Sequence, residues 1–185
     1  MPVQVDPLMP VHPLTVTDVS QMVEASILGK DDRVELLDGV LVEMNPPGPA
    51  HSYALRELTA IVTPVAVARG LRVAVQDSLD LGTPISLPQP DLAVVPMTSP
   101  DRHASDALLV VEIARSSRRL DLGRKAAIYA EGGVPEYWVL DVERRELVVH
   151  RKPVGGRYTS ILTLAEHETV TPAAADVTVR LAALL

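Results

Sequence analysis

The chain has 185 residues, of which 47% are hydrophobic, no Cys, and a net charge of −7 at pH 7. The length suits one domain, the lack of Cys excludes disulfides and thiolate metal sites, and the acidic balance argues against a generally basic, nucleic-acid-binding surface. No apolar run approaches the roughly 20 residues that cross a bilayer, and no secretion signal is present. We therefore expect a cytoplasmic protein without membrane contact.

The N-terminal residues differ from the rest of the chain. Residues 1–15 are proline-rich and are expected to form an arm, whereas residues 16–185 are expected to form a single domain. The first predicted element is a helix over Val16–Leu28, because its apolar residues recur at helical spacing. Thr17 is the expected N-cap of this helix.

A hairpin and a long helix are predicted next. Two apolar runs in Val34–Met44 flank Asp38-Gly39, a pair that strongly favours a tight turn between strands. After a proline-rich loop, apolar residues recur at helical spacing over His51–Arg69. Pro64 lies inside this segment and is expected to bend the helix.

The rest of the chain alternates strand-like runs with one further helix, expected over Leu120–Glu131. The tail, Val177–Leu185, is expected to close the core as a strand or a short helix. The predicted fold class is α/β or α+β, with a mixed sheet flanked by helices. The remaining predicted strands are Arg72–Gln76, Ser78–Leu81, Leu92–Val95, Leu108–Ile113, Glu136–Asp141, Glu146–Arg151 and Tyr158–Leu164.

Glu112 stands inside the run ALLVVEIA, which is apolar on both faces of the expected strand. Such a strand is normally buried on both sides, and an unpaired carboxylate there would cost several kcal/mol. Glu112 therefore needs a cation, a hydrogen-bond donor or a metal. The ordinary alternatives are an ion pair with an arginine, or a strand end that reaches solvent.

Asp91 opens a short strand that is expected to pair antiparallel with the strand of Glu112. In a register whose partner numbers add up to 203, Asp91 lies opposite Glu112. Opposed residues have Cβ atoms roughly 5 Å apart, and two carboxylates that close favour a hard divalent cation between them. The alternative for Asp91 alone is a turn-forming Asp after a proline.

Lys125 is the third candidate, on the second long helix. A lysine beside a phosphate can orient the attacking water or offset developing negative charge. The ordinary interpretation, slightly favoured by the residues alone, is an exposed pair with Asp121 at i,i+4 spacing.

Three blocks together resemble one known family. They are RVELLDGVLVEMNPPGPAH, PDLAVVP and LLVVEIARSSRRLDLGRKAAIYAEGGVPEYWVLDVERRELVVHR. Their order resembles that of the Uma2 family of restriction-endonuclease-like proteins, whose fold is similar to that of the PD-(D/E)XK nucleases. The resemblance covers roughly Val16 to Arg151.

The resemblance implies roles for particular residues. Pro90-Asp91 would supply the "PD" and Glu112 the "(D/E)", so that Asp91 and Glu112 would bind Mg²⁺ or Mn²⁺. The usual lysine would stand two residues after Glu112, but this chain has Ala114 there. The resemblance implies that Lys125, on the following helix, takes over that role.

One further site residue follows from the same family pattern. Glu35, in the block RVELLDG, would help to hold the metal or to orient water, and a solvent-facing strand glutamate is an equally good interpretation. The carbonyl oxygen of Ile113 is a further candidate ligand. His51 opens a helix after the proline-rich loop, and such a histidine is usually incidental.

Basic and aromatic side chains surround the same segment. Four arginines near Glu112 would hold phosphates locally or would form a solvated basic loop. They are Arg115, Arg118, Arg119 and Arg124. The aromatic residues Tyr129, Tyr137 and Trp138 are interpreted mainly as core.

The sequence thus predicts a Mg²⁺-dependent endonuclease that hydrolyses DNA phosphodiester bonds. It contains no phosphate-binding glycine-rich loop, His-rich metal motif or nucleophile elbow. Two alternatives stay open: a non-catalytic binding or assembly module with the same fold, and a metal-dependent hydrolase of another phosphorylated substrate. DNA is the expected partner, and whether the chain forms a homodimer is left open.

Overall fold

The computed structural model describes residues 11–29, 31–97 and 99–185. The predicted arm, residues 1–15, lies largely outside these described residues, and its separation from one domain over residues 16–185 stays a prediction. No helix in the described ranges is long and apolar enough to cross a membrane.

Helix α1 (Val16–Glu24) begins at a cap that the sequence analysis placed wrongly. The side chain of Thr15 accepts a hydrogen bond from the main-chain N–H of Asp18, and the Asp18 carboxylate accepts one from the N–H of Thr15. This reciprocal capping box sets the helix start two residues before Thr17. Ser26 adopts a left-handed backbone (φ 58°), which is incompatible with the predicted continuation of the helix to Leu28.

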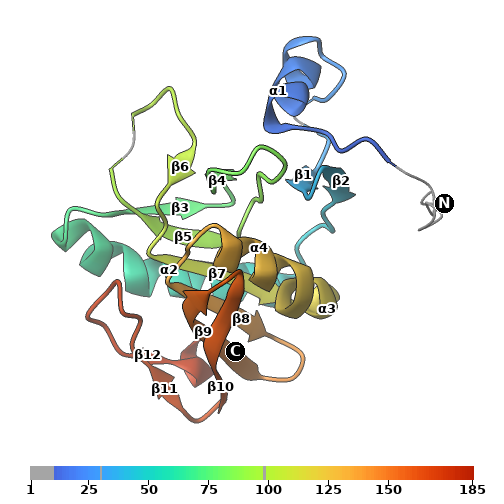
Figure 1. Cartoon of the computed structure of the whole chain (residues 1–185). Coiled ribbons are helices and arrows are strands. Elements are labelled where there is room, and N and C mark those ends of the chain that lie inside the picture. Colours follow the sequence, from blue (N-terminus) through green and yellow to red (C-terminus); the bar gives the residue numbers. More distant parts are fainter. Residues whose placement is uncertain (1–10, 30, 98) are drawn as a thin grey trace.

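The predicted hairpin is confirmed. Strands β1 (Val34–Leu37) and β2 (Val40–Glu43) pair antiparallel around Asp38 and Gly39. Both turn residues have positive φ, 50° and 77°, as the favoured two-residue hairpin turn requires. The hairpin and α1 lie together at one end of the molecule (Figure 1).

A six-stranded sheet forms the centre of the fold, and its strand order is β10-β9-β8-β7-β5-β3. Only β7 and β8 run parallel, while every other neighbouring pair is antiparallel. The sheet is therefore mixed, as predicted. Its strands are β3 (Arg72–Val75), β5 (Leu92–Val95), β7 (Leu109–Ala114), β8 (Glu136–Asp141), β9 (Glu146–Val154) and β10 (Arg157–Ala165).

Short elements complete the edges of the fold. The segment predicted as Ser78–Leu81 contains β4 (Leu79–Asp80), which pairs with β6 (Ala104–Ser105). In the tail, β12 (Val179–Arg180) pairs with β11 (Thr169–Val170) and leads into the 3₁₀ helix η2 (Leu181–Ala183). The tail thus contains both of the alternatives that were predicted for it.

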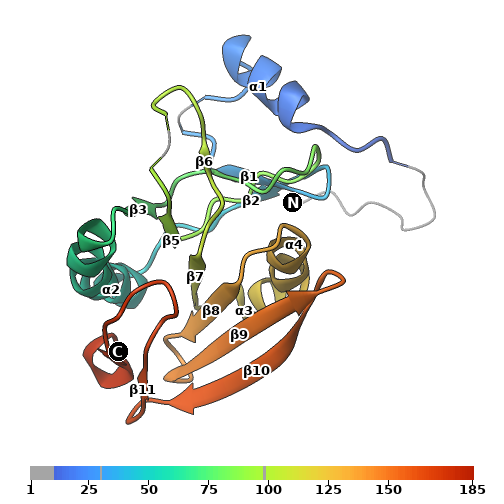
Figure 2. The same cartoon turned by 60° about the vertical axis from the view of Figure 1, so that its left-hand side comes forward.

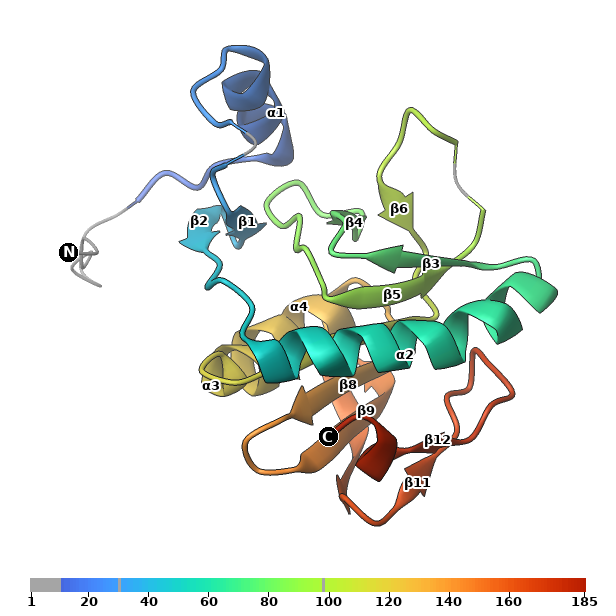
Figure 3. The same ribbon diagram turned by 180° about the vertical axis from the view of Figure 1, so that it is seen from behind.

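Helices cover both faces of the central sheet, which makes an α+β architecture (Figures 2 and 3). Helix α2 (Pro49–Ala68) begins with a proline, which suits the first turn of a helix. Its fully buried residues recur every four positions and face the sheet. They are Ala54, Leu58, Val62 and Ala66.

The opposite face is covered by a segment that the sequence predicted as one helix over Leu120–Glu131. It consists of α3 (Arg118–Leu120), a π-helical turn η1 (Asp121–Lys125) and α4 (Ala126–Glu131). This segment follows β7 directly and crosses to the parallel strand β8. The first and last residues of η1, Asp121 and Lys125, are both buried. Both belong to the candidate site described below.

Candidate active site

The predicted register between the two strands that carry the acids is confirmed. Leu92 of β5 pairs with Val111 of β7, and the partner numbers along this ladder add up to 203. Asp91 immediately precedes β5, so the same register sets it opposite Glu112. Because side chains alternate between the faces of a sheet, Asp91 shares its face with Ala93, which packs in the core on the α4 side.

The "PD" pair has a clear structural consequence at this strand end. One further step of the register places Pro90 opposite Ile113, and proline has no N–H to donate. The N–H of Ile113 donates to Oδ2 of Asp91, at 2.8 Å. In an antiparallel ladder the N–H and C=O of one residue face the same neighbour. The Ile113 carbonyl therefore faces the Asp91 side without a donor from residue 90.

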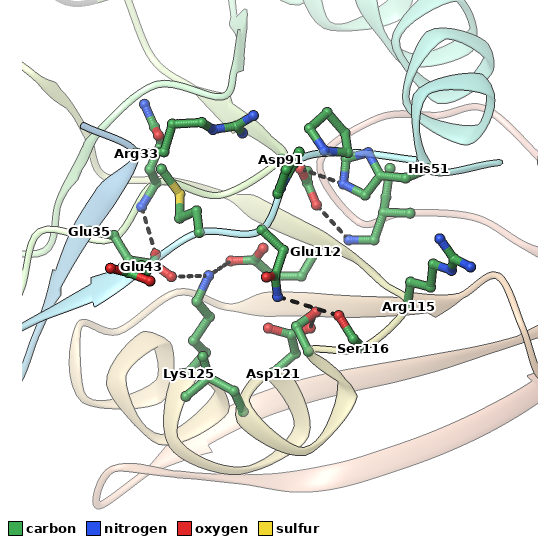
Figure 4. Close-up of a pocket in the computed structure, with 18 of the residues that line it drawn as sticks. Arg33, Glu35, Glu43, His51, Asp91, Glu112, Arg115, Ser116, Asp121 and Lys125 are labelled. Carbon is green, nitrogen blue, oxygen red and sulfur yellow. Dashed lines mark hydrogen bonds and ion pairs between the residues drawn. The ribbon is translucent and has the colours of Figure 1, made fainter. Parts of the chain in front are cut away.

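Asp91 is held by three groups from different elements. Besides the Ile113 N–H, Nε2 of Gln76 donates to Oδ1 at 3.3 Å, and Nε2 of His51 lies 2.9 Å from the same oxygen. The side chains of Asp91 and His51 are each 13% exposed. His51, interpreted from the sequence as incidental, therefore contacts the central aspartate (Figure 4).

Glu112 is buried, as its apolar run predicted. Its Oε1 accepts hydrogen bonds from Nζ of Lys125 at 3.0 Å and from the hydroxyl of Tyr129 at 2.7 Å. Its partner is therefore a lysine, so both ordinary alternatives, an arginine pair and a solvent-exposed strand end, are wrong. Burial raises the pKa of Glu112 to about 8; Lys125 opposes this shift, and the neighbouring acids Asp121, Asp91 and Glu35 add to it.

Lys125 is inside the protein and lies between two carboxylates. Its Nζ is 2.8 Å from Glu35 and 3.0 Å from Glu112, and its side chain is 6% exposed. The interpretation as an exposed pair with Asp121 is therefore wrong. Burial by itself lowers the pKa of Lys125, but the carboxylates of Glu112 and Glu35 raise it above its ordinary value, so the ammonium keeps its charge.

Glu35 reaches the site from the hairpin. It is 5% exposed, so the interpretation as a solvent-facing strand residue is wrong. One of its carboxylate oxygens binds Lys125, and the other accepts the main-chain N–H of Gln89 at 3.1 Å. The hairpin is thus attached to the sheet at this site through a buried ion pair.

Asp121 was not predicted as a site residue. It is 1% exposed, and its carboxylate accepts a hydrogen bond from the Ser117 hydroxyl at 2.6 Å. Burial raises its pKa to about 6, while Lys125 and the Ser117 hydroxyl oppose the shift. Spacing alone could not reveal this, because i,i+4 is also the spacing of an exposed helical pair. Single π-helical turns are frequent at functional sites.

These side chains line one cavity of about 1320 Å³ between the hairpin, the start of α2 and the η1 turn. The five side chains are those of Asp91, Glu112, Lys125, Glu35 and Asp121. The predicted arginine cluster divides: Arg115, Arg119 and Arg124 line the cavity, whereas Arg118 pairs with Asp141 and Glu146 elsewhere. Arg33 from the hairpin, which the sequence analysis did not consider, also lines it.

The aromatic residues that were interpreted as core are buried. Tyr129, Tyr137 and Trp138 each have no exposed surface. Tyr129 also has the polar contact with Glu112 that was not predicted. The Tyr137 hydroxyl donates to the main-chain oxygen of Asp121 at 3.0 Å, so the aromatic core also supports the π-helical turn.

The buried acids predict how stability depends on pH. Glu112 and Asp121 have raised pKa values, about 8 and about 6, so the folded chain binds these protons more tightly than the unfolded chain does. Their contribution to the free energy of unfolding is complete at pH values below the ordinary pKa of each group. It is lost as the pH rises through the raised pKa values. Without metal, urea denaturation should show a stability loss on the order of 5 kcal/mol from pH 5 to pH 8.5, most of it from Glu112.

A matched pair of variants assigns this effect. Glu112→Gln should remove much of the pH dependence and should be more stable than wild type at pH 8.5, since it lacks the buried charge. Glu24→Gln changes an exposed acid and should leave the curve unchanged. Metal-free stability that rises with pH across this window would contradict the assignment.

Comparison with known proteins agrees with this geometry. The model of the Uma2 family, described as "Putative restriction endonuclease", matches residues 19–182, so the chain belongs to the Uma2 family. This confirms the resemblance found in the sequence. No curated protein matches the chain.

A solved structure shows the same fold. It is that of a "putative nuclease belonging to DUF820" from Anabaena variabilis ATCC 29413. It superimposes with a TM-score of 0.74 and 15% sequence identity, over 93% of this chain and 97% of that one. The restriction-endonuclease-like, mixed-sheet fold class that was predicted is therefore confirmed.

Proposed function

We propose that this chain is a Mg²⁺- or Mn²⁺-dependent endonuclease that hydrolyses DNA phosphodiester bonds. The observation that supports it most is the arrangement at the end of β5 and β7. There Asp91 and Glu112 occupy opposed positions on one face, and Lys125 contacts Glu112 in the same cavity. Membership of a family described as "Putative restriction endonuclease" supports a nuclease activity.

The donor set suits a hard divalent cation. Within residues 11–29, 31–97 and 99–185, no three His, Asp or Glu side chains gather closely enough to hold a metal by themselves. Mg²⁺ at phosphoryl-transfer sites typically takes one or two carboxylates and completes its shell with water and substrate phosphate. Asp91, Glu112 and the Ile113 carbonyl would provide that set, and the bound ion would supply an activated water and charge neutralisation.

The protein's own residues would do the rest. Gln76 and His51 fix the Asp91 carboxylate in place. Lys125 offers a permanent positive charge next to Glu112, where it would orient the attacking water or balance charge on the phosphate. The arginines that line the cavity, Arg33 and Arg119 among them, would hold phosphates of the strand despite the net negative charge of the chain.

The test combines metal binding with cleavage. Wild-type protein should bind Mn²⁺ in calorimetry and should nick supercoiled plasmid with Mg²⁺ but not with EDTA. Metal binding together with hydrolysis of only a small phosphodiester, such as bis(p-nitrophenyl) phosphate, would indicate another phosphorylated substrate. If the protein neither binds metal nor cleaves plasmid, single strands or RNA, the chain is a non-catalytic module that keeps the fold.

A further inference from the structure

A second, smaller cavity of about 470 Å³ adjoins the candidate active site. It lies between the outer side of α2 and the end of β3, which is the edge strand of the sheet. Pro47, His51 and Gln76 line both cavities, so the two adjoin each other at these residues. We refer to it as the α2–β3 groove. Its other lining residues are Ser52, Leu55, Arg56, Thr59, Ala60 and Val75.

The residues between the two cavities are the ones that hold Asp91. His51 lies 2.9 Å from Oδ1 of Asp91, and Gln76 donates to the same oxygen at 3.3 Å. Whatever occupies the groove therefore touches side chains that contact the proposed metal ligand. A group bound there lies next to a phosphate bound at Asp91.

Gln76 also has an unusual backbone. Its φ is 49°, a left-handed conformation that costs energy for a residue other than Gly or Asn. The conformation is fixed from both sides, because its N–H donates to the main-chain oxygen of Asp91 and its own oxygen accepts Nε2 of Gln89. Strained residues of this kind cluster at ligand-binding positions. Here the strain sets the side chain at the junction of the two cavities.

The groove has the chemistry of a site for one flat heterocycle. Its walls are apolar at Pro47, Leu55 and Val75, and Val75 is 41% exposed. Ser52 and Gln76 offer a few polar groups at the margin. The volume lies within the roughly 300–1,000 Å³ that is usual for small-ligand sites. It is large enough for a single nucleobase.

We infer that the α2–β3 groove binds one unpaired nucleobase of single-stranded DNA, next to the phosphate held at Asp91. This inference rests on the proposed nuclease function and adds a preference for single strands over duplex. Single strands are favoured because extruding a base from a duplex costs a few kcal/mol. Among the described residues that line the groove there is no Phe, Tyr or Trp to replace an extruded base in the stack.

The test measures binding rather than cleavage. Fluorescence anisotropy in Ca²⁺ compares an oligothymidylate of about eight nucleotides with an abasic oligonucleotide of the same length and charge. Wild type should bind the base-containing strand about tenfold more tightly or better. Ala60→Phe, which fills the groove, should lose about tenfold in affinity for it and keep its affinity for the abasic strand. Ala68→Phe changes another exposed alanine of α2, outside the groove, and should bind as wild type does.

Several outcomes overturn the inference. They are equal affinity of wild type for the two oligonucleotides, absence of binding to both, and an equal loss by Ala60→Phe on single-stranded and duplex DNA. Circular dichroism melting of the Phe variants shows whether they are folded. Metal-dependent plasmid nicking is measured in parallel. If the protein nicks plasmid but its binding does not depend on the base, the groove does not bind a nucleobase, and the proposed nuclease function still stands.

Discussion

Replacing Lys125 with methionine is expected to lower the rate of DNA cleavage by about a hundredfold or more, the effect typical of losing a positioned charge partner. The affinity for Mg²⁺ should stay equal to that of wild type or rise slightly, because a positive charge next to Glu112 has gone. Methionine keeps the length of the side chain and avoids a cavity. Single-turnover plasmid cleavage at saturating Mg²⁺, with calorimetry for the metal, measures both quantities.

The same variant has a stability signature that an exposed lysine could not give. The ammonium lies between Glu35 and Glu112 with only 6% of its side chain exposed. Removing one partner of a buried ion pair costs about 3–5 kcal/mol. Metal-free Lys125→Met should therefore be strongly destabilised, and Mn²⁺ should restore more stability to it than to wild type, since a cation then returns to the carboxylates.

Lys152→Met is the matched control, because Lys152 is exposed on β9 and does not line the active-site cavity. Its cleavage rate and stability should both equal those of wild type. If Lys125→Met cleaves DNA at the wild-type rate, Lys125 has no role in the reaction. If it loses stability alone, the buried ion pair serves only to hold the hairpin against the sheet.

The strands around the site could be predicted because local patterns determine them. The run that contains Glu112 is apolar on both faces, and Pro90 cannot donate to a ladder, so the sequence itself marks where pairing must end. The register that brings Asp91 opposite Glu112 was assumed from the antiparallel pairing of two such strands, and the structure confirms it. The Asp38-Gly39 turn was equally local, since the hairpin turn needs two residues with positive φ.

The helix-borne residues could not be placed in this way. A charged residue on a helix is normally assigned to solvent, and Lys125 is buried only because Glu35 and Glu112 arrive from distant strands to meet it. Asp121 was misread for the same reason. Glu35 itself depends on where the hairpin docks, and two four-residue strands do not specify that docking in their own sequence.

His51 shows a different limit of sequence reasoning. It stands in the first turn of α2, and nothing in its neighbourhood distinguishes it from an ordinary loop histidine. Its contact with Asp91 depends on how α2 is laid across the sheet, which follows from the buried stripe of Ala54, Leu58, Val62 and Ala66 further along the helix. Tertiary packing, and not the local sequence, brings it to the site.

Replacing Asp91 with asparagine is expected to weaken metal binding and cleavage together, in contrast to Lys125→Met. Loss of a residue that only orients a ligand costs about 10–100-fold in metal affinity or activity, so loss of the ligand charge itself should cost at least about a hundredfold in Mg²⁺ affinity. Asparagine keeps an oxygen that can accept the Ile113 N–H, so the strand end should stay intact. The metal-free melting temperature should therefore change little.

Two comparison variants make the Asp91→Asn result specific. Asp176→Asn removes an exposed charge outside the active-site cavity and should bind metal and cleave as wild type does. His51→Ala leaves the carboxylate but removes one group that holds it, so its loss of metal affinity should be smaller, about tenfold. Wild-type Mg²⁺ affinity in Asp91→Asn would contradict the metal site. Unchanged metal affinity combined with lost cleavage would mean that Asp91 acts on the substrate directly and that the ion is bound through Glu112.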